Sequence, residues 1–413
     1  MEQVQTEVNL RRRAPLLALL VASTVSEIGS MLTLIALPWF VLQTTGSAAR
    51  TGLTGFSVAI PGFFVGIFGG TVVDRLGYRR SSVVADVVSG IGLGLVPTLY
   101  YTVGLPFGVL MALVFVGSML AIPGITARRS LLPELAEMAG TRLERVNAAF
   151  ESIQNLALLL GPPLAGLLIA WQGATTVLWI DAGTFVFSAL VVGTLVPVFA
   201  LTTESETQDR PRYRTQLAEG LRFLKADSLL RDMAIVVGIF NGLGAPAFAV
   251  ALPVFAKQEY GSATVLGLMA SGFAVGALAG VAAYGAIGHR LSRRMIWYLG
   301  YLAMPCIYWT LAAHPTLPIV LAVFAFMGIL TAPLNPMMTT IRHERIPAKM
   351  RGRVFATYSA ITQVVSPVGI VLGGFAISTF GFHPTVLALA IIVQVGSVAV
   401  FIVPSLRKMD ARP

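Results

Sequence analysis

Long apolar runs alternate with short polar intervals along this chain. A helix rises about 1.5 Å per residue, so about 20 apolar residues cross the ~30 Å hydrocarbon core of a bilayer. With charges and turn residues taken as boundaries, the pattern predicts about 12 transmembrane helices and an all-α membrane protein. The expected ranges are 14–43, 50–73, 80–101, 105–127, 145–171, 174–199, 232–256, 263–288, 295–313, 316–341, 353–380 and 383–404.

The composition excludes a water-soluble protein of this length. Of the 413 residues, 56% are hydrophobic and only 12% are charged, and the mean hydropathy is +0.80. A soluble fold of this size needs a charged surface that this composition cannot supply. The first apolar run is too long for the core of a signal peptide, so we expect it to be retained as the first helix.

The basic residues carry a topological signal. A net charge of +10 could by itself indicate nucleic acid or anionic lipid as a partner. However, all of the 29 Lys and Arg residues except Arg50 and Lys257 lie at the chain ends or between alternate apolar runs. The positive-inside rule then places both termini and every basic cluster in the cytoplasm. We therefore expect contact with membrane lipids and none with nucleic acid.

Few residues of the chain are typical of cofactor or metal chemistry. Cys306 is the only cysteine, and the four histidines show no ligand spacing. The phosphate-binding pattern Gly-x-x-x-x-Gly-Lys-Ser/Thr is absent from the sequence, so ATP hydrolysis by this chain is unsupported. No metal and no cofactor are expected.

The longest polar interval, residues 201–231, divides the chain near its midpoint. It predicts an amino-terminal six-helix half over 1–200, a cytoplasmic linker over 201–231 and a carboxyl-terminal six-helix half over 232–413. Within the linker, residues 213–225 carry leucines at helical spacing, which favours a helix lying on the membrane surface.

The two halves resemble each other. Two groups of residues recur in the second half after nearly the same interval, which indicates duplication. The pairs are Gly70 to Leu76 with Gly285 to Leu291, Arg145-Val146 with Arg353-Val354, Gly161 with Gly369, and Gly166 with Gly374. A duplicated pair of six-helix halves is the architecture of secondary transporters, which bind substrate near the bilayer midplane.

The loop GTVVDRLGYRR, residues 70–80, resembles the signature loop between helices two and three of the major facilitator superfamily. The matching residues are Gly70, Asp74, Arg75, Gly77 and Arg79, and Tyr78 replaces the usual basic residue. The resemblance implies that Asp74 latches the halves on the cytoplasmic side, near the N-terminus of the eleventh helix. The alternative is a solvated loop that only sets topology.

The segment Gly161-Pro162-Pro163-Leu164-Ala165-Gly166 lies in the fifth expected helix. It resembles the antiporter motif of the same superfamily, with Ala165 where glycine is common. The resemblance makes Gly161, Pro162 and Gly166 candidate motif residues. The alternative is a small-residue seam at which two helices pack.

Further segments extend the resemblance over nearly the whole chain. They include ALPWFVLQTTGSA, VADVVSG, TARRSLLPE, RVNAAFESIQNLALLLGPPLAGL and AEGLRFL. Together they look like the Tap-type multidrug exporters of mycobacteria and related actinobacteria, which are associated with tetracycline and aminoglycoside efflux. One element is missing, because Leu113 lies where many proton-coupled drug exporters carry an arginine in helix four.

The resemblance implies a major facilitator fold and an antiporter of drugs and protons, not an enzyme. Such a protein exports amphiphilic or cationic drugs by alternating access, as a monomer in the inner membrane of a bacterial cell. The alternative within this class is an exporter of a native metabolite such as a siderophore or lipid. A non-transporting membrane receptor or a passive channel is the alternative outside it, and neither needs internal repetition.

Two acidic residues are candidates for proton coupling. Glu27 lies about 14 residues, or roughly 21 Å, into the first helix, near the bilayer midplane where a carboxyl is costly and usually functional. The alternative is a hydrogen-bonded contact with a neighbouring Ser or Asn. Asp86 lies further along helix three than Arg79 and Arg80, and we expect an ion pair with one of them. Asp181 is expected to be structural.

Other polar residues at membrane depth are candidates for the substrate cavity, although an interhelical hydrogen bond is an equal alternative for each. The candidate cavity residues are Glu27, Met31, Gln154, Asn155, Asn241, Asn335 and Gln363. Met31, Phe240, Phe248 and Met338 are candidates for the soft apolar wall that a promiscuous site needs, and core packing is the stronger alternative for each of them alone.

Overall fold

We describe a computed structural model of this chain, covering residues 2–199 and 213–410, with side chains described for 12–61, 76–199 and 217–410. The chain forms two compact units. The first comprises Met1–Phe40 and Ser57–Gln208, and the second comprises Val41–Phe56 and Asp209–Pro413. The hairpin between the first two helices therefore belongs to the second unit, a feature that the sequence did not predict.

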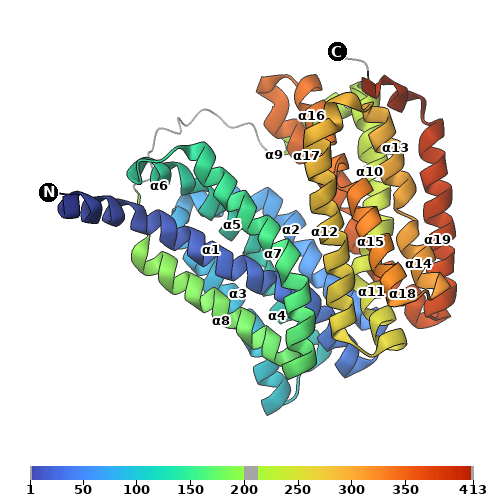
Figure 1. Cartoon of the computed structure of the whole chain (residues 1–413), viewed down its shortest axis with the longest axis horizontal. Coiled ribbons are helices and arrows are strands. Elements are labelled where there is room, and N and C mark those ends of the chain that lie inside the picture. Colours follow the sequence, from blue (N-terminus) through green and yellow to red (C-terminus); the bar gives the residue numbers. More distant parts are fainter. Residues whose placement is uncertain (1, 200–212, 411–413) are drawn as a thin grey trace. The chain divides into compact units, whose positions relative to one another are not determined.

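The amino-terminal unit is built from most of α1 and α2 and from α3 to α8 (Figure 1). Their bounds are α1 Glu2–Thr45, α2 Ala48–Leu76, α3 Tyr78–Thr102, α4 Phe107–Met119, α5 Ala121–Ser130, α6 Leu132–Met138, α7 Leu143–Gln172 and α8 Ala174–Leu195. The short α6 covers one end of this unit, where Leu135 packs with Leu19 of α1, Phe150 of α7 and Val192 of α8. All four side chains are almost fully buried.

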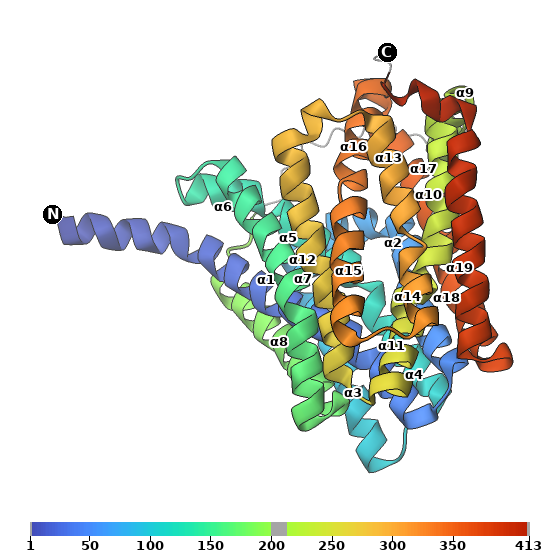
Figure 2. The ribbon, with the colours of Figure 1, turned by 45° about the vertical axis from the view of Figure 1, so that its right-hand side comes forward.

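The carboxyl-terminal unit contains α9 to α19, with α12 and α15 side by side in both views (Figure 1, Figure 2). The first bounds are α9 Tyr213–Ala226, α10 Ser228–Pro246, η1 Ala247–Ala251, α11 Leu252–Phe255, η2 Ala256–Tyr260, α12 Ala263–Ile287, η3 Gly288–Arg290, α13 Arg293–Ala303 and α14 Cys306–Ala313. The remaining bounds are α15 Leu317–Thr331, α16 Leu334–Arg345, η4 Ala348–Met350, α17 Arg351–Gln363, α18 Val365–Phe380, α19 Phe382–Ala399, η5 Val400–Ile402 and η6 Pro404–Asp410.

The all-helical membrane fold predicted from the sequence is confirmed. Within the described residues there is no strand, and 11 helical spans are long and apolar enough to cross a membrane. Helix α2 is a further helix of 29 residues, and it contains the positions 62–75 whose side chains lie outside the description. The structure is thus consistent with the expected twelve helices.

Four of the expected helices are each divided in two by a short break. These divisions separate α4 from α5, α13 from α14, α15 from α16, and α17 from α18. Each break lies at a proline or one turn before it, because proline lacks the N–H that would bond the carbonyl four residues earlier. The prolines are Pro123, Pro305, Pro333 and Pro367.

The internal repetition is visible in the backbone. Gly173 between α7 and α8 has φ 85° and ψ 160°, and Gly381 between α18 and α19 has φ 88° and ψ 165°. Both conformations lie in the region that glycine adopts and other residues avoid. The two turns therefore have the same geometry at equivalent positions of the two halves.

The end of the expected linker is helical. Asp227 caps α10 by accepting hydrogen bonds from the N–H groups of Leu229 at 2.9 Å and Leu230 at 3.1 Å, so this helix begins before the expected residue 232. Helix α9 packs against α17, where Glu219 pairs with Arg353. Leu224 of α9 is buried.

Candidate functional site

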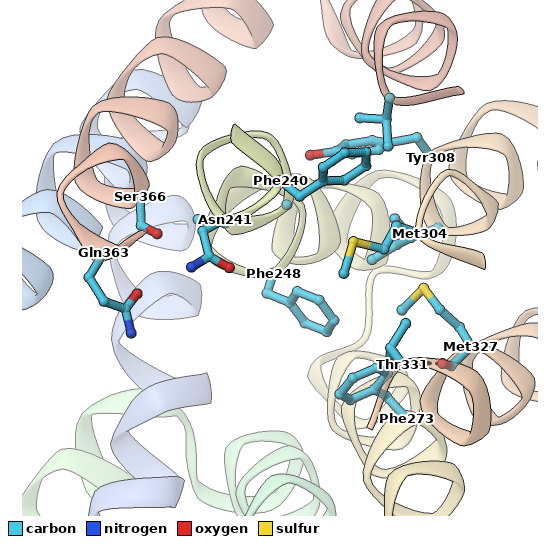
Figure 3. A pocket seen from close by; sticks show the side chains of 14 residues that line it. Phe240, Asn241, Phe248, Phe273, Met304, Tyr308, Met327, Thr331, Gln363 and Ser366 are labelled. Carbon is cyan, nitrogen blue, oxygen red and sulfur yellow. Dashed lines mark hydrogen bonds between the residues drawn. The ribbon is translucent and has the colours of Figure 1, made fainter. Parts of the chain in front are cut away.

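The carboxyl-terminal unit encloses a cavity of about 290 Å³. Aromatic, methionine and small side chains form most of its wall, and none of the described residues that line it is charged (Figure 3). The lining residues are Phe240, Asn241, Gly244, Ala245, Phe248, Phe273, Met304, Ile307, Tyr308, Met327, Thr331, Gln363, Ser366 and Val393. The rings of Phe248 and Phe273 meet edge to face, with their centroids 5.3 Å apart.

Amide and hydroxyl groups lie at defined places in this wall. The Asn241 amide donates a hydrogen bond of 2.9 Å to the backbone oxygen of Thr362, which fixes its orientation. The Tyr308 hydroxyl donates to the backbone oxygen of Leu243 at 2.5 Å, so the ring of Tyr308 contributes mainly its apolar surface. The Gln363 side chain is exposed and lies near Asn241 and Ser366 in Figure 3.

This chemistry suits apolar and aromatic ligands of varied shape. Flexible thioethers and aromatic faces adapt to different ligands, and a small number of polar groups orients them. A cationic ligand would meet aromatic faces, which attract cations through the quadrupole of the ring. The cavity is therefore a candidate for binding part of a drug-like molecule.

The amino-terminal unit buries the ion pair expected for Asp86, but with a partner that the sequence did not predict. Arg128 of α5 pairs with Asp86 of α3, and both side chains are less than 5% exposed. The Ser188 hydroxyl of α8 donates to Asp86 at 2.7 Å and accepts from Arg128 at 3.1 Å, while Ser82 accepts from Arg128 at 3.1 Å. An ion pair favours the charged form of both partners. The group therefore joins α3, α5 and α8.

The expected partners of Asp86 were wrong. Arg79 donates instead to the backbone oxygen of Gly193 on α8, and Arg80 is exposed. Arg79 lies two helical turns before Asp86, about 10 Å away along the same helix, whereas Arg128 approaches from a neighbouring helix. A buried arginine is thus present in this unit, contributed by α5 and not by the position of Leu113 in α4.

Glu27 belongs to a polar chain that crosses three helices. Glu27 is half-buried and lies beside Gln154 of α7. The positive charges of Arg128 and Arg129 attract its carboxyl. Arg129 donates to the Gln154 side chain at 2.9 Å and pairs with Glu151 at 3.0 Å. The hydrogen-bonding neighbour of Glu27 is therefore a glutamine, where the sequence suggested a serine or asparagine.

The helix-five motif contacts α1 directly. A Cβ atom added at Gly161 would overlap the Met31 side chain, so α7 and α1 approach closely there. Pro162 and Gly166 are buried. In the second half, a Cβ atom added at Gly369 would overlap the backbone of Gly242 in α10.

The signature loop is described only in part. Gly77 has φ 81° in the turn between α2 and α3. The side chains of Gly70, Asp74 and Arg75 lie outside the described residues.

The structure brings together only some of the expected cavity residues. Asn241 and Gln363 line the cavity, as do Phe240 and Phe248. Asn155 and Asn335 are exposed, and Met338 is buried; the three lie outside its wall.

Sequence reasoning missed several lining residues, namely Phe273, Met304, Tyr308 and Met327. In a helix that is apolar on all sides, the sequence does not indicate which side chains face a cavity and which face lipid.

A family model described as Major Facilitator Superfamily matches residues 19–256 and 234–412. The chain is 31% identical to the multidrug efflux pump Tap of Mycolicibacterium fortuitum, over 97% of this chain and 98% of that protein. It is 32% identical to multidrug efflux pump Tap of Mycobacterium tuberculosis (strain ATCC 25618 / H37Rv), over 97% and 96% of the two chains. The crystal structure of the nucleoside transporter NupG aligns with a TM-score of 0.76 at 13% identity, over 94% of this chain and 98% of that one, which is a likeness of fold.

Proposed function

Since this chain belongs to the major facilitator superfamily, we propose that it is a proton-coupled exporter of amphiphilic or cationic drugs. It is similar over nearly its full length to proteins named multidrug efflux pumps, so the proposal concerns the whole chain. Export would proceed by alternating access, with both termini in the cytoplasm as the basic clusters indicate. No enzymatic activity is part of this proposal.

The observation that carries the proposal is the neutral, aromatic wall of the cavity in the carboxyl-terminal unit. Phe240, Phe248 and Phe273 present apolar faces, and Met304 and Met327 add flexible thioethers. A site for one polar metabolite needs matched hydrogen-bonding groups, because each unpaired buried polar group weakens binding. A wall with few polar groups suits many amphiphilic molecules instead.

Glu27 supplies the proposed link to protons. A carboxyl at this depth can be neutral in one state and ionised in another, and its ionised form attracts a cationic drug. Proton and drug then compete for the same negative charge. Gln154 can donate a hydrogen bond to the ionised carboxylate or accept one from the neutral acid, so it accommodates both forms.

The close helix contacts suit a rocking motion. Gly161 against Met31 and Gly369 against Gly242 give each half one helix pair with little side-chain volume between the backbones. Small residues let such helices shift against each other without a large change in packing. In our proposal, these helix pairs slide against each other when the protein changes between its inward-open and outward-open states.

The experiment is drug transport by the purified chain in proteoliposomes, with an imposed pH gradient and ethidium or tetracycline as the probe. We expect uphill drug movement that stops when the pH gradient is collapsed. Phe248→Ala should weaken apparent drug affinity about tenfold, since a lost aromatic contact is worth about 1 kcal/mol or more. The matched control is Phe326→Ala, because Phe326 is 54% exposed and lies outside the cavity wall.

Two results would contradict the proposal. Drug transport that is indifferent to the pH gradient would remove the proton coupling. The wild-type chain could also move a native metabolite and none of a panel of amphiphilic drugs. The substrate would then be a metabolite of that class and not a drug.

A further inference from the structure

A second acidic side chain of the amino-terminal unit is more deeply buried than Glu27. Asp181 is the only charged residue of α8, and it is 1% exposed. It lies about 10 Å along the helix from Ala174, at a rise of ~1.5 Å per residue. A carboxyl at such a position is costly in a membrane protein and is usually functional.

Two threonine hydroxyls hold this carboxyl. Thr33 of α1 donates to Asp181 Oδ2 at 2.5 Å, and Thr184 donates to Asp181 Oδ1 at 2.9 Å. The Thr184 hydroxyl also lies 2.8 Å from the backbone oxygen of Asp181. A hydroxyl can donate to a carboxylate and can also accept from a protonated carboxylic acid. The threonines therefore accommodate the group in either protonation state.

The backbone of α1 leaves room for the carboxyl at Gly29. A Cβ atom at this position would overlap both the Asp181 carboxylate and the Thr184 hydroxyl. The missing side chain thus lets Asp181 lie directly against α1, one turn from Thr33. Gly29, Thr33, Asp181 and Thr184 form one site, which we call the Asp181 site.

The described charged groups on the helices around this site either bond elsewhere or are exposed. Arg79 of α3 donates to the backbone oxygen of Gly193, whereas Arg80 of α3 and Arg12 and Arg13 of α1 are exposed. Glu27 on α1 lies beside Gln154, and Asp86 on α3 pairs with Arg128. Glu151 on α7 pairs with Arg129 of α5.

At the start of α7, Glu144 and Arg145 are exposed. Within the described part of the chain, no Lys, Arg or His forms an ion pair with Asp181. A bound proton is therefore the simplest way to neutralise this carboxyl, because a buried charge without a partner is strongly disfavoured.

A cavity of about 180 Å³ reaches the Asp181 site. Its lining includes Ser30, Ser89 and Ser118 besides Thr33 and Asp181. The Ser30 and Ser89 hydroxyls donate to backbone oxygens and can still accept a hydrogen bond from water. A water molecule occupies about 30 Å³ of liquid and needs two to four polar partners, so this space can hold a few hydrogen-bonded waters. Such waters can deliver a proton to Asp181 and accept it again.

We infer that the Asp181 site is a proton-binding site of the transport cycle, in addition to Glu27. On loading, a cavity water transfers a proton and an O–H bond forms on the Asp181 carboxylate. On release, that bond breaks and the proton returns to water, with no electron transfer. The inference rests on the proposed function, since it adds a second carboxyl to proton-coupled export. Asp86 is not proposed as a second such site, because the charge of its carboxylate is already balanced by Arg128.

The test follows protonated carboxyl groups by infrared difference spectroscopy of the purified full chain during a pH titration. It requires no drug. We expect a protonated-carboxyl band that is lost in Asp181→Asn and retained in Glu27→Gln. A spectrum of Asp181→Asn identical to that of the wild type would overturn the inference. So would a band that responds to added sodium ions at constant pH, because the site would then bind a metal cation.

A second variant keeps the test decisive if Asp181→Asn does not fold. Thr33→Val preserves shape but removes one hydroxyl, and it should shift the pH midpoint of the band. The control is Thr194→Val on α8, the helix of Asp181, because Thr194 is exposed and its hydroxyl donates to the backbone oxygen of Leu190. Thr194→Val should leave the midpoint unchanged. An unchanged midpoint in Thr33→Val would count against the site.

Transport measurements separate this inference from the proposed function. In proteoliposomes, Asp181→Asn should reduce the number of protons exchanged per ethidium molecule, and an undiminished ratio would overturn its part in transport. If the wild type shows no drug-driven proton movement while the Asp181 band titrates normally, the proposed function fails and the proton site remains. If transport is proton-coupled and the band is absent, the inference alone fails.

Discussion

The two units repeat the same helix arrangement but differ in their buried polar and charged residues. In the amino-terminal unit, Asp86, Arg128 and Asp181 are almost fully buried. Among the described residues of the carboxyl-terminal unit, no charged side chain is buried, and its cavity is lined by aromatic, methionine, amide and hydroxyl groups. Duplication therefore preserved the packing frame while the polar residues diverged. Our proposals assign proton chemistry and the attraction of cationic drugs by Glu27 to the first unit, and the apolar drug contacts to the second.

The shared frame is visible at paired glycines. Gly173 and Gly381 form turns of the same conformation, and Gly161 and Gly369 each admit a close helix neighbour. These positions depend on backbone geometry, which both copies need in order to fold. A buried charge has no such structural requirement, so one copy can lose it or gain it without loss of the fold.

The largest expected effect is on coupling through Glu27. Glu27→Gln imitates the protonated acid permanently, so export against the drug gradient should be abolished. Cationic drugs should be affected more than neutral ones. The measurement is drug accumulation in proteoliposomes under an imposed pH gradient. The control is Glu144→Gln, since Glu144 is exposed at the start of α7 and lies outside the polar chain of Glu27.

Undiminished coupling in Glu27→Gln would contradict this prediction. Asp181 and Asp86, the buried acids in the described part of the amino-terminal unit, would then be the next residues to test.

The second prediction concerns the stability of the buried ion pair. Arg128→Met leaves Asp86 buried without its partner, which should destabilise the fold by about 3–5 kcal/mol. Arg129→Met removes an exposed pair and should cost about 1 kcal/mol or less. Denaturant unfolding in detergent measures both. The double variant Asp86→Leu with Arg128→Met should recover most of the stability that Arg128→Met loses. If Arg128→Met and Arg129→Met lost the same unfolding free energy, the buried pair would be no more important for stability than the exposed one.

The third prediction compares the equivalent glycines of the two halves. Gly369→Ala places a methyl group against the rigid backbone of Gly242, while Gly161→Ala meets the Met31 side chain. Both should cost about 1–3 kcal/mol, with Gly369→Ala the larger, because a side chain can adjust more readily than a backbone. The control is Gly352→Ala, where nothing lies within 4 Å of the added atom.

The reverse order would indicate that the first half is the more tightly packed. Thermal unfolding of the purified variants ranks the three.

The smallest expected effect is on drug selectivity. Asn241→Leu removes the amide that bonds Thr362 and faces the cavity, so drugs with hydrogen-bonding groups should bind about three- to tenfold more weakly, as for a lost hydrogen bond of ~1 kcal/mol. Purely apolar drugs should change little. The control is Asn335→Leu, because Asn335 is exposed and outside the cavity wall. Equal effects of the two variants on drug affinity would argue against this cavity as the drug site.

The sequence determined the helical membrane fold and its approximate helix ranges, because the length of an apolar run and the position of charges act locally. It also revealed the repetition, since Gly161 and Gly369 are both recognisable by their spacing. Helix breaks were missed although the prolines were visible. A proline inside an apolar run permits either a kink or a break, and packing against neighbouring helices selects between them.

Only the tertiary structure decided which side chains meet. Helices such as α8, α12 and α15 are apolar on nearly every side, so the sequence does not specify their rotation about their own axes. That rotation brings Arg128 to Asp86 in place of Arg79, and it places Asp181 against Thr33. The rotation of their helices also turns Phe273 and Met327 toward the cavity, which the sequence alone does not reveal. A residue's own sequence neighbourhood fixes its depth in the membrane, whereas its partners come from other helices, and those contacts form only when the helices pack.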